Sequence, residues 1–156
     1  MRVEDLHSLV FNPAWTSKLL ACFLSGARGV PNHIGIDYDL LFLVLPFVFD
    51  SSVRNVLCEK RSSSTLKGLL ASDVVRAFLL RLDERVVDYR AVTKLGLIAS
   101  SGIILVQDGK VSVAEVVDYK KYAGDMRPYL KAAFNLGGIF SKSSCSEVFL
   151  RLGVYS

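Results

Sequence analysis

The chain is poor in the two residue types that most often build metal sites and covalent crosslinks. It has three cysteines, Cys22, Cys58 and Cys145, which are widely spaced, odd in number and without a Cys-x-x-Cys pair. This pattern argues against a disulfide framework and against a zinc site, and free thiols fit a reducing, cytoplasmic compartment. The two histidines, His7 and His33, lie far apart and have no cysteine or histidine nearby. No metal centre is therefore expected.

A long apolar run is also missing. The most apolar stretch, Leu40 to Phe49, has about ten residues, whereas a helix that spans a bilayer needs about twenty. The first ten residues carry Glu4 and Asp5 and lack the apolar core of a signal peptide. We therefore expect no association with a membrane.

No motif for catalysis or cofactor binding is present. The nucleophile elbow, the P-loop and the glycine pattern of dinucleotide-binding folds are absent, and Gly26, Gly29 and Gly35 have no phosphate-binding spacing. The neighbouring carboxylates of Asp37 and Asp39 are better explained by helix capping and solvation than by acid–base chemistry. We therefore expect no catalytic residues and no cofactor, and the protein is predicted not to be an enzyme.

The composition fits one domain over 1–156. Hydrophobic residues make up 51% of the 156 residues and charged residues 22%, with a net charge of +4. The apolar surplus suits either an ordinary core or a surface that is buried against a partner. The mild positive charge tolerates nucleic acid nearby without requiring it.

Helices are expected through the first half of the chain. Asn12 and Pro13 are favourable first residues for a helix over 13–25, which Gly26 and Gly29 can end. The run over 40–49 predicts a buried helix that is kinked at Pro46.

The next segments predict a short helix over 53–58 and a polar, basic stretch over 59–65, which is either flexible or a contact loop. Helical spacing returns over 66–82, where Ser72 or Asp73 can cap a new helix, and continues over 84–100. The residues expected to face inward on that last helix are Val87, Ala91, Leu95, Leu97 and Ile98.

A β-hairpin is expected next. The β-branched stretch 103–106 and the alternating stretch 111–113 flank Asp108-Gly109, a pair that readily adopts the positive φ angles of a tight turn. Residues 115–122 are predicted to be helical, and Asp125 is expected to cap a strong helix. In that helix Gly137-Gly138 either allows close backbone approach or weakens the helix. Finally, a capping box predicts a helix over 148–152 that Gly153 ends.

The predicted fold class is mainly α with one β-hairpin, in which a winged-helix-like core carries flanking helices. A helical part would cover about 1–58, the winged-helix-like part about 65–115 and the C-terminal helices about 116–156. In winged helices the third helix, here 84–100, reads DNA beside the wing. The acidic residues on and near that helix and at the wing tip weaken DNA reading. They are Asp83, Glu84, Asp88 and Asp108.

Several segments, taken in order, resemble a known family. They are Phe11-Asn12-Pro13-Ala14, Leu41 to Pro46 followed by Arg54, Thr65 to Leu70, Asn135 to Phe140, and Leu152-Gly153-Val154. Over almost the whole chain, this arrangement is similar to the middle component of the bacterial three-component ABC-ATPase systems.

The resemblance implies a non-enzymatic adaptor between an ABC ATPase, related to structural-maintenance-of-chromosomes (SMC) and DNA-repair ATPases, and an effector protein. Such systems are thought to act in conflict with phages (anti-phage defence). DNA, contacted directly or through the ATPase, and a second copy of the chain are further expected partners. The partner-binding residues expected for this role are Arg54, Arg61, Arg90 and Lys110. The alternatives are a winged-helix DNA-binding transcriptional regulator and an enzyme or small-ligand protein of unrecognised type.

Overall fold

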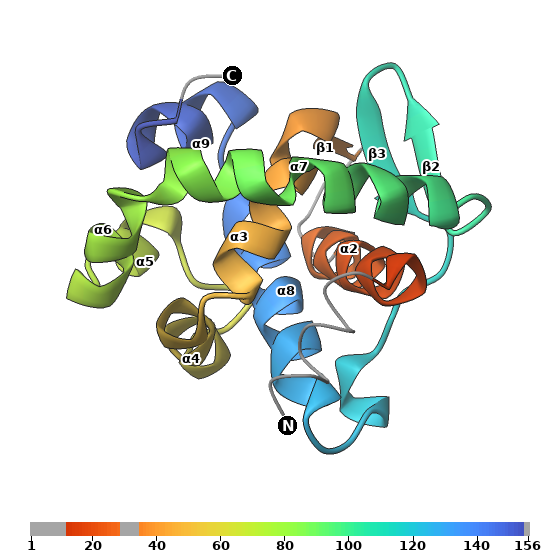
Figure 1. Ribbon diagram of the computed structural model, residues 1–156, viewed down its shortest axis with the longest axis horizontal. Helices are drawn as coiled ribbons and strands as arrows, with labels where there is room; N and C mark the ends of the chain where they lie inside the picture. Colours follow the sequence, from red (N-terminus) through yellow and green to blue (C-terminus); the bar gives the residue numbers. More distant parts are fainter. Residues whose placement is uncertain (1–11, 29–34, 155–156) are drawn as a thin grey trace.

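The protein is mainly helical, with a small sheet at one edge (Figure 1). The computed structural model describes residues 12–28 and 35–154. The elements are α2 (Pro13–Arg28), β1 (Ile36–Asp37), η1 (Tyr38–Leu43), α3 (Val44–Val48), α4 (Ser51–Glu59), α5 (Leu66–Leu70), α6 (Asp73–Leu79), α7 (Leu82–Ala99), β2 (Ile104–Gln107), β3 (Lys110–Val113), η2 (Tyr119–Lys121), α8 (Met126–Phe140) and α9 (Cys145–Leu152). His7 and His33, which are predicted to form no metal centre, lie outside the described residues.

The packing of α2 against α8 forms the centre of the molecule. A Cβ atom at Gly26 would lie 1.9 Å from the carbonyl oxygen of Phe134, and one at Gly137 would lie 1.8 Å from that of Phe23. Only glycine permits this approach, so the prediction of close packing at Gly137 is confirmed. The predicted helix over 13–25, with Gly26 and Gly29 as its possible ends, is too short: α2 continues through Gly26, which serves as a packing surface, to Arg28.

The apolar run over 40–49 forms two short pieces rather than one kinked helix. The 3-10 helix η1 passes directly into α3, and Pro46 occupies the first turn of α3, where its missing N–H costs no helical hydrogen bond. Phe47 is fully buried and packs edge-on against Phe78 and Phe140. Among the described residues no single helix is long and apolar enough to cross a membrane; 38–48 and 51–59 meet that test only together, bent by 106°.

The polar stretch after α4 is tied to α8 and to the residues that follow it. The buried Asn135 donates from Nδ2 to the carbonyl oxygens of Leu57 and Lys60, both at 2.9 Å. Lys142 Nζ donates to the carbonyl oxygens of Ser62 and Ser64. These hydrogen bonds fix the backbone of the stretch over 59–65, which the sequence predicts to be either flexible or a contact loop.

Helix α7 forms where it is predicted, but it packs on a different face. Val87 (64% exposed), Leu95 (53%) and Ile98 (74%) point to solvent and Ala91 is exposed, so the predicted inward face is wrong for these residues; Leu97 alone of the predicted set packs partly buried against the core. Thr93 and Gly96 are buried instead, and a Cβ at Gly96 would lie 2.3 Å from the Thr16 side chain. Small residues on α7 therefore let it approach α2 closely, while Val87, Leu95 and Ile98 are left on the outer face of the helix.

The predicted hairpin is present, with Asp108 at φ 54° and Gly109 at φ 75° in its turn. It belongs to a three-stranded antiparallel sheet of order β1-β3-β2, in which Ile36 of β1 lies opposite Val111 of β3. The expectation of a lone hairpin is therefore corrected. The third strand, β1, has two residues and lies before the segment 65–115 that was predicted to form the winged-helix-like part.

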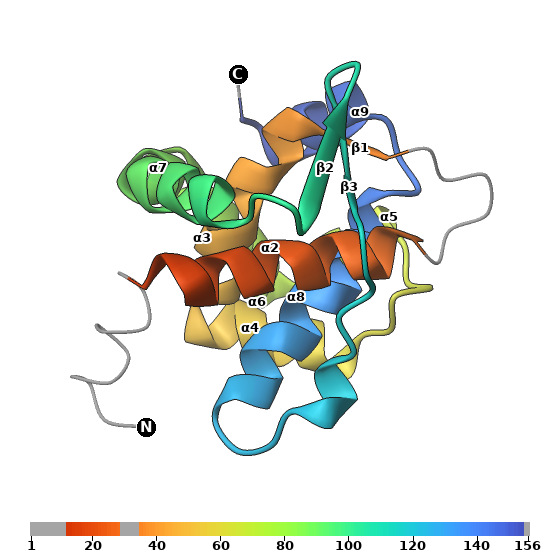
Figure 2. The same cartoon turned by 90° about the vertical axis from the view of Figure 1, so that its right-hand side faces the viewer.

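The last helix, α9, begins and ends where its local signals predict. Ser144 Oγ accepts the N–H of Glu147 at 3.1 Å, and Gly153 ends α9 with φ 73°. The prediction that residues 115–122 are helical is wrong, because only the short 3-10 turn η2 forms there. Figure 2, turned by 90°, shows α2 lying between α7 and α8, with the hairpin standing beside α7.

Candidate functional site

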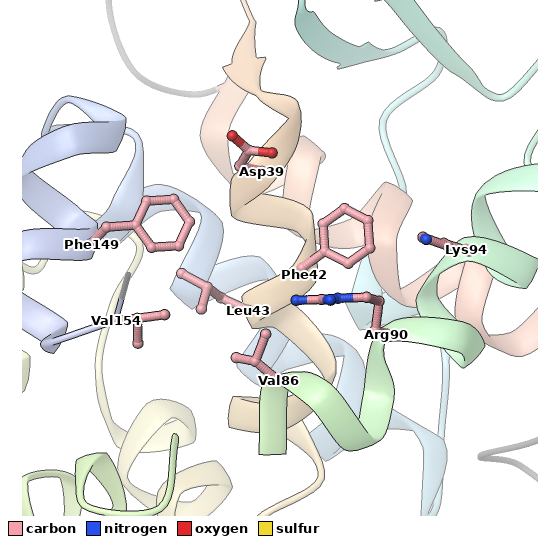
Figure 3. Close-up of a pocket in the computed structure, with 8 residues that line it drawn as sticks. All are labelled: Asp39, Phe42, Leu43, Val86, Arg90, Lys94, Phe149 and Val154. Atoms are coloured by element: carbon pink, nitrogen blue, oxygen red, sulfur yellow. The ribbon is translucent and has the colours of Figure 1, made fainter. Parts of the chain in front are cut away.

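The best candidate site is a hollow of about 280 Å³ between η1, α7 and α9 (Figure 3). Its lining residues are Asp39, Phe42, Leu43, Val86, Arg90, Lys94, Phe149 and Val154. They come from parts of the chain that are far apart in sequence. The hollow is therefore a product of the tertiary fold.

Apolar side chains form the floor and two walls of the hollow. Leu43, Val86 and Val154 are buried, and the rings of Phe42 and Phe149 are half-buried. The turn at the end of α9 brings Val154 back, because its N–H donates to the carbonyl oxygen of Phe149 at 3.1 Å. The floor is thus formed by residues that the core already fixes in place.

Two cations on α7 border this apolar surface. Arg90 and Lys94 are four residues apart on α7, so they lie on one side of the helix, and both are exposed. Neither forms an ion pair with the residues that the structure describes. Figure 3 shows Arg90 extending from α7 toward Phe42 and Leu43, while Asp39 lies at the other end of the hollow. The hollow therefore has one basic and one acidic end.

An apolar ridge continues outward from these cations along α7. We define the α7 ridge as Val87, Ala91, Leu95 and Ile98, whose spacing places them on one helix face. All four are exposed, and Leu105 and Val106 on β2 are exposed as well. Isolated exposed apolar residues are ordinary, but a row of them on one helix face is typical of a contact surface.

The ionisable groups with perturbed pKa values lie outside the hollow. Burial raises the pKa of the Cys22 thiol to about 12. Burial and the nearby Asp37 raise the pKa of the Cys145 thiol to about 11. Both thiols stay protonated near neutral pH and are weak nucleophiles. In the described ranges no group of three or more His, Cys, Asp or Glu side chains could hold a metal ion.

Of the four residues predicted to bind partners, Arg90 lines the hollow. The guanidinium of Arg54 donates to the carbonyl oxygen of Val48 at 3.0 Å and lies 4.1 Å from the centre of the Tyr129 ring. The Arg54 guanidinium therefore makes its contacts within the protein and is not presented to a partner.

The other two predicted residues lie apart from the hollow. Lys110 forms an ion pair of 2.7 Å with Asp37 between β3 and β1, and Arg61 is exposed in the loop after α4. Sequence reasoning missed Lys94, although its spacing of four from Arg90 is a readable signal. It also missed Phe42 and Phe149, for which no signal exists, because only the fold brings them together.

The arrangement defines a class: a small, mainly helical protein with an apolar hollow that is rimmed by cations on α7. More particularly, the chain belongs to the family described as ABC-three component (ABC-3C) system Middle Component 3, whose model matches residues 2–156. The resemblance to middle components is thereby confirmed, and the chain is one part of a multi-component ABC system. No curated protein and no solved structure matches it.

Proposed function

We propose that the chain is a non-enzymatic adaptor that joins an SMC-like ABC ATPase to an effector protein in a bacterial anti-phage system. Family membership supports a middle position between other components. The observation that carries the proposal is the outer surface of α7, where the α7 ridge is exposed beside Arg90 and Lys94, two cations that form no ion pair within 12–28 and 35–154. Apolar side chains flanked by arginine are typical anchors of protein interfaces.

An adaptor needs two contact surfaces, and α7 borders two hollows. The first takes Val86, Arg90 and Lys94 from the middle of α7, and the second, of about 500 Å³, lies at the N-terminal end of the helix, where Arg81 and Arg85 meet exposed Leu80. Figure 1 shows α7 running along one side of the molecule from α6 to the hairpin. We propose that this one helix presents two partners side by side, one at its N-terminal end and one along its middle.

The alternative function is a winged-helix DNA-binding regulator. One observation favours it: the hairpin follows α7 directly, and β1 completes a three-stranded sheet with it. The charge on α7 opposes it, because Glu84 and Asp88 are exposed on the same helix as Arg90 and Lys94. Binding of duplex DNA that weakens steeply with added salt would support this alternative.

The adaptor proposal is tested by reconstitution with the ABC ATPase and the effector encoded beside this chain. We expect the two to co-elute in size-exclusion chromatography when the chain is present and to separate when it is left out. Association of ATPase and effector to the same extent without the chain would contradict an adaptor role. Failure of the chain to bind the ATPase would do so as well.

A further inference from the structure

We propose that the hollow between η1, α7 and α9 binds a short acidic–apolar segment of a partner protein. A bulky apolar side chain would enter the hollow, and a carboxylate close to it in sequence would meet Arg90 and Lys94. This inference rests on the adaptor function and adds the chemistry of the segment that is recognised.

The size and the preformed walls of the hollow suit a bulky apolar side chain. Its volume of about 280 Å³ is just below the range of about 300 to 1,000 Å³ that is usual for small-molecule and cofactor sites. The walls are preformed, since Leu43 is fully buried and the ring of Phe42 packs edge-on against Tyr38, with 5.4 Å between ring centroids. An apolar anchor could therefore enter without the walls having to be rebuilt.

The positive charges at the hollow set the second requirement for the bound segment, which is a carboxylate. Arg90 and Lys94 stand one helical turn apart and have no carboxylate partner in the described part of the chain. A guanidinium and an ammonium at this spacing suit a carboxylate, and arginine can bind one through two hydrogen bonds. Asp39 at the opposite end would repel a second acid there, so the segment should bind in one direction.

Nucleic acid fits this surface less well than a peptide. A phosphodiester backbone requires a row of cations, and each contact replaces a bound counterion. In the hollow, two cations stand at one end, apolar side chains form the floor, and Asp39 lies at the opposite end. An apolar group joined to a carboxylate matches both features of the site, whereas a polyphosphate chain matches only the cations.

The first experiment uses overlapping synthetic peptides that cover the sequences of the ATPase and the effector encoded beside this chain. Binding to the full chain is measured by fluorescence anisotropy. We expect the peptides that bind to share a bulky apolar residue close to Asp or Glu. Binding by no peptide, or only by peptides without an acid, would overturn the proposal. The proposal would also be overturned if acetate or inorganic phosphate displaced a bound peptide as well as an unlabelled copy of that peptide does, since a free anion would then be the ligand.

A charge reversal locates the binding site. The double variant Arg90→Glu/Lys94→Glu should lower peptide affinity about tenfold or more, because two attractive contacts become repulsive. The matched control is Lys120→Glu/Lys121→Glu, which alters net charge equally at two exposed lysines outside the hollow. We expect the control to change affinity less than about twofold. An equal loss in both variants would contradict a site at the hollow.

A charge swap distinguishes direct contact from a structural effect. A bound peptide whose acid is replaced by lysine should bind the Arg90→Glu/Lys94→Glu variant better than it binds the wild-type chain. A general loss of structure could not restore binding in this way. If this variant still joins the ATPase to the effector with full affinity, the inference about the hollow fails while the adaptor function stands. If peptides bind at the hollow but the chain does not join the ATPase to the effector, the adaptor function fails while the inference about the hollow stands.

Discussion

The contact between α2 and α8 allows a sharp test with a single methyl group, Gly137→Ala. The new Cβ would lie 1.8 Å from the carbonyl oxygen of Phe23, whereas ordinary contact begins near 3.4 Å. The obstacle is backbone and not a flexible side chain, so the two central helices must move apart. Overpacking of a well-packed core typically costs 1–3 kcal/mol, and we place this case at about 3 kcal/mol.

Helix propensity offsets part of that cost. Alanine is favoured over glycine inside a helix by about 1 kcal/mol, so the expected net loss for Gly137→Ala is about 2 kcal/mol. For a domain of this size, that corresponds to a fall in Tm of about 4–8 °C. Urea unfolding followed by circular dichroism measures the free energy of unfolding, and calorimetry measures Tm.

A control variant isolates the steric effect. At Gly68 in α5, an added Cβ would meet only the Thr65 Oγ1 atom at 3.4 Å. Gly68→Ala should therefore leave stability unchanged or raise it by up to about 1 kcal/mol. A Gly137→Ala protein as stable as the wild type would refute the reasoning. An equal loss in both variants would refute it as well, because the close helix contact would then not be the cause.

Three further predictions concern polar groups inside the fold. Asn135→Ala should cost about 2–3 kcal/mol in urea unfolding, because the carbonyl oxygens of Leu57 and Lys60 lose a shared buried donor; a loss below about 0.5 kcal/mol would contradict this. Thr93→Val should keep or raise stability, because the buried Oγ1 has no hydrogen-bond partner among the described residues, and a loss above about 1 kcal/mol in the same assay would be inconsistent with that. Burial raises the pKa of Cys22 from 9.0 to about 12, so unfolding releases its proton more readily and stability should fall as pH rises from 9 toward 12. Cys22→Ala should reduce the dependence of the free energy of unfolding on pH, measured from unfolding curves at several pH values. An unchanged pH dependence would exclude the Cys22 thiol as its cause.

Local signals in the sequence predicted the ends of several elements. Asn12 Oδ1 accepts from the N–H groups of Ala14 and Trp15, Ser72 and Ser144 cap α6 and α9, and Asp108-Gly109 turns the hairpin. Each of these features depends on residues within four positions of one another. They are therefore readable without knowledge of the fold.

The orientation of α7 could not be read in the same way. Val87, Leu95 and Ile98 have the spacing of a core-facing stripe, and periodicity alone does not show whether a stripe faces the core or a partner. What decides the orientation is the fit of Gly96 against Thr16 on α2, a contact between residues far apart in sequence. The same holds for the hollow, whose Phe42 and Phe149 meet Arg90 only after the chain has folded.

The most direct test of α7 as the docking surface is site-specific photocrosslinking of the assembled system. A photoreactive amino acid is placed at Leu95, on the α7 ridge, or at Val116, which is 54% exposed against 53% for Leu95 but lies outside α7. We expect crosslinks from position 95 to the ABC ATPase or the effector, and few from position 116. Equal crosslinking from both positions, or crosslinks from position 116 alone, would contradict the assignment of α7 as the docking surface.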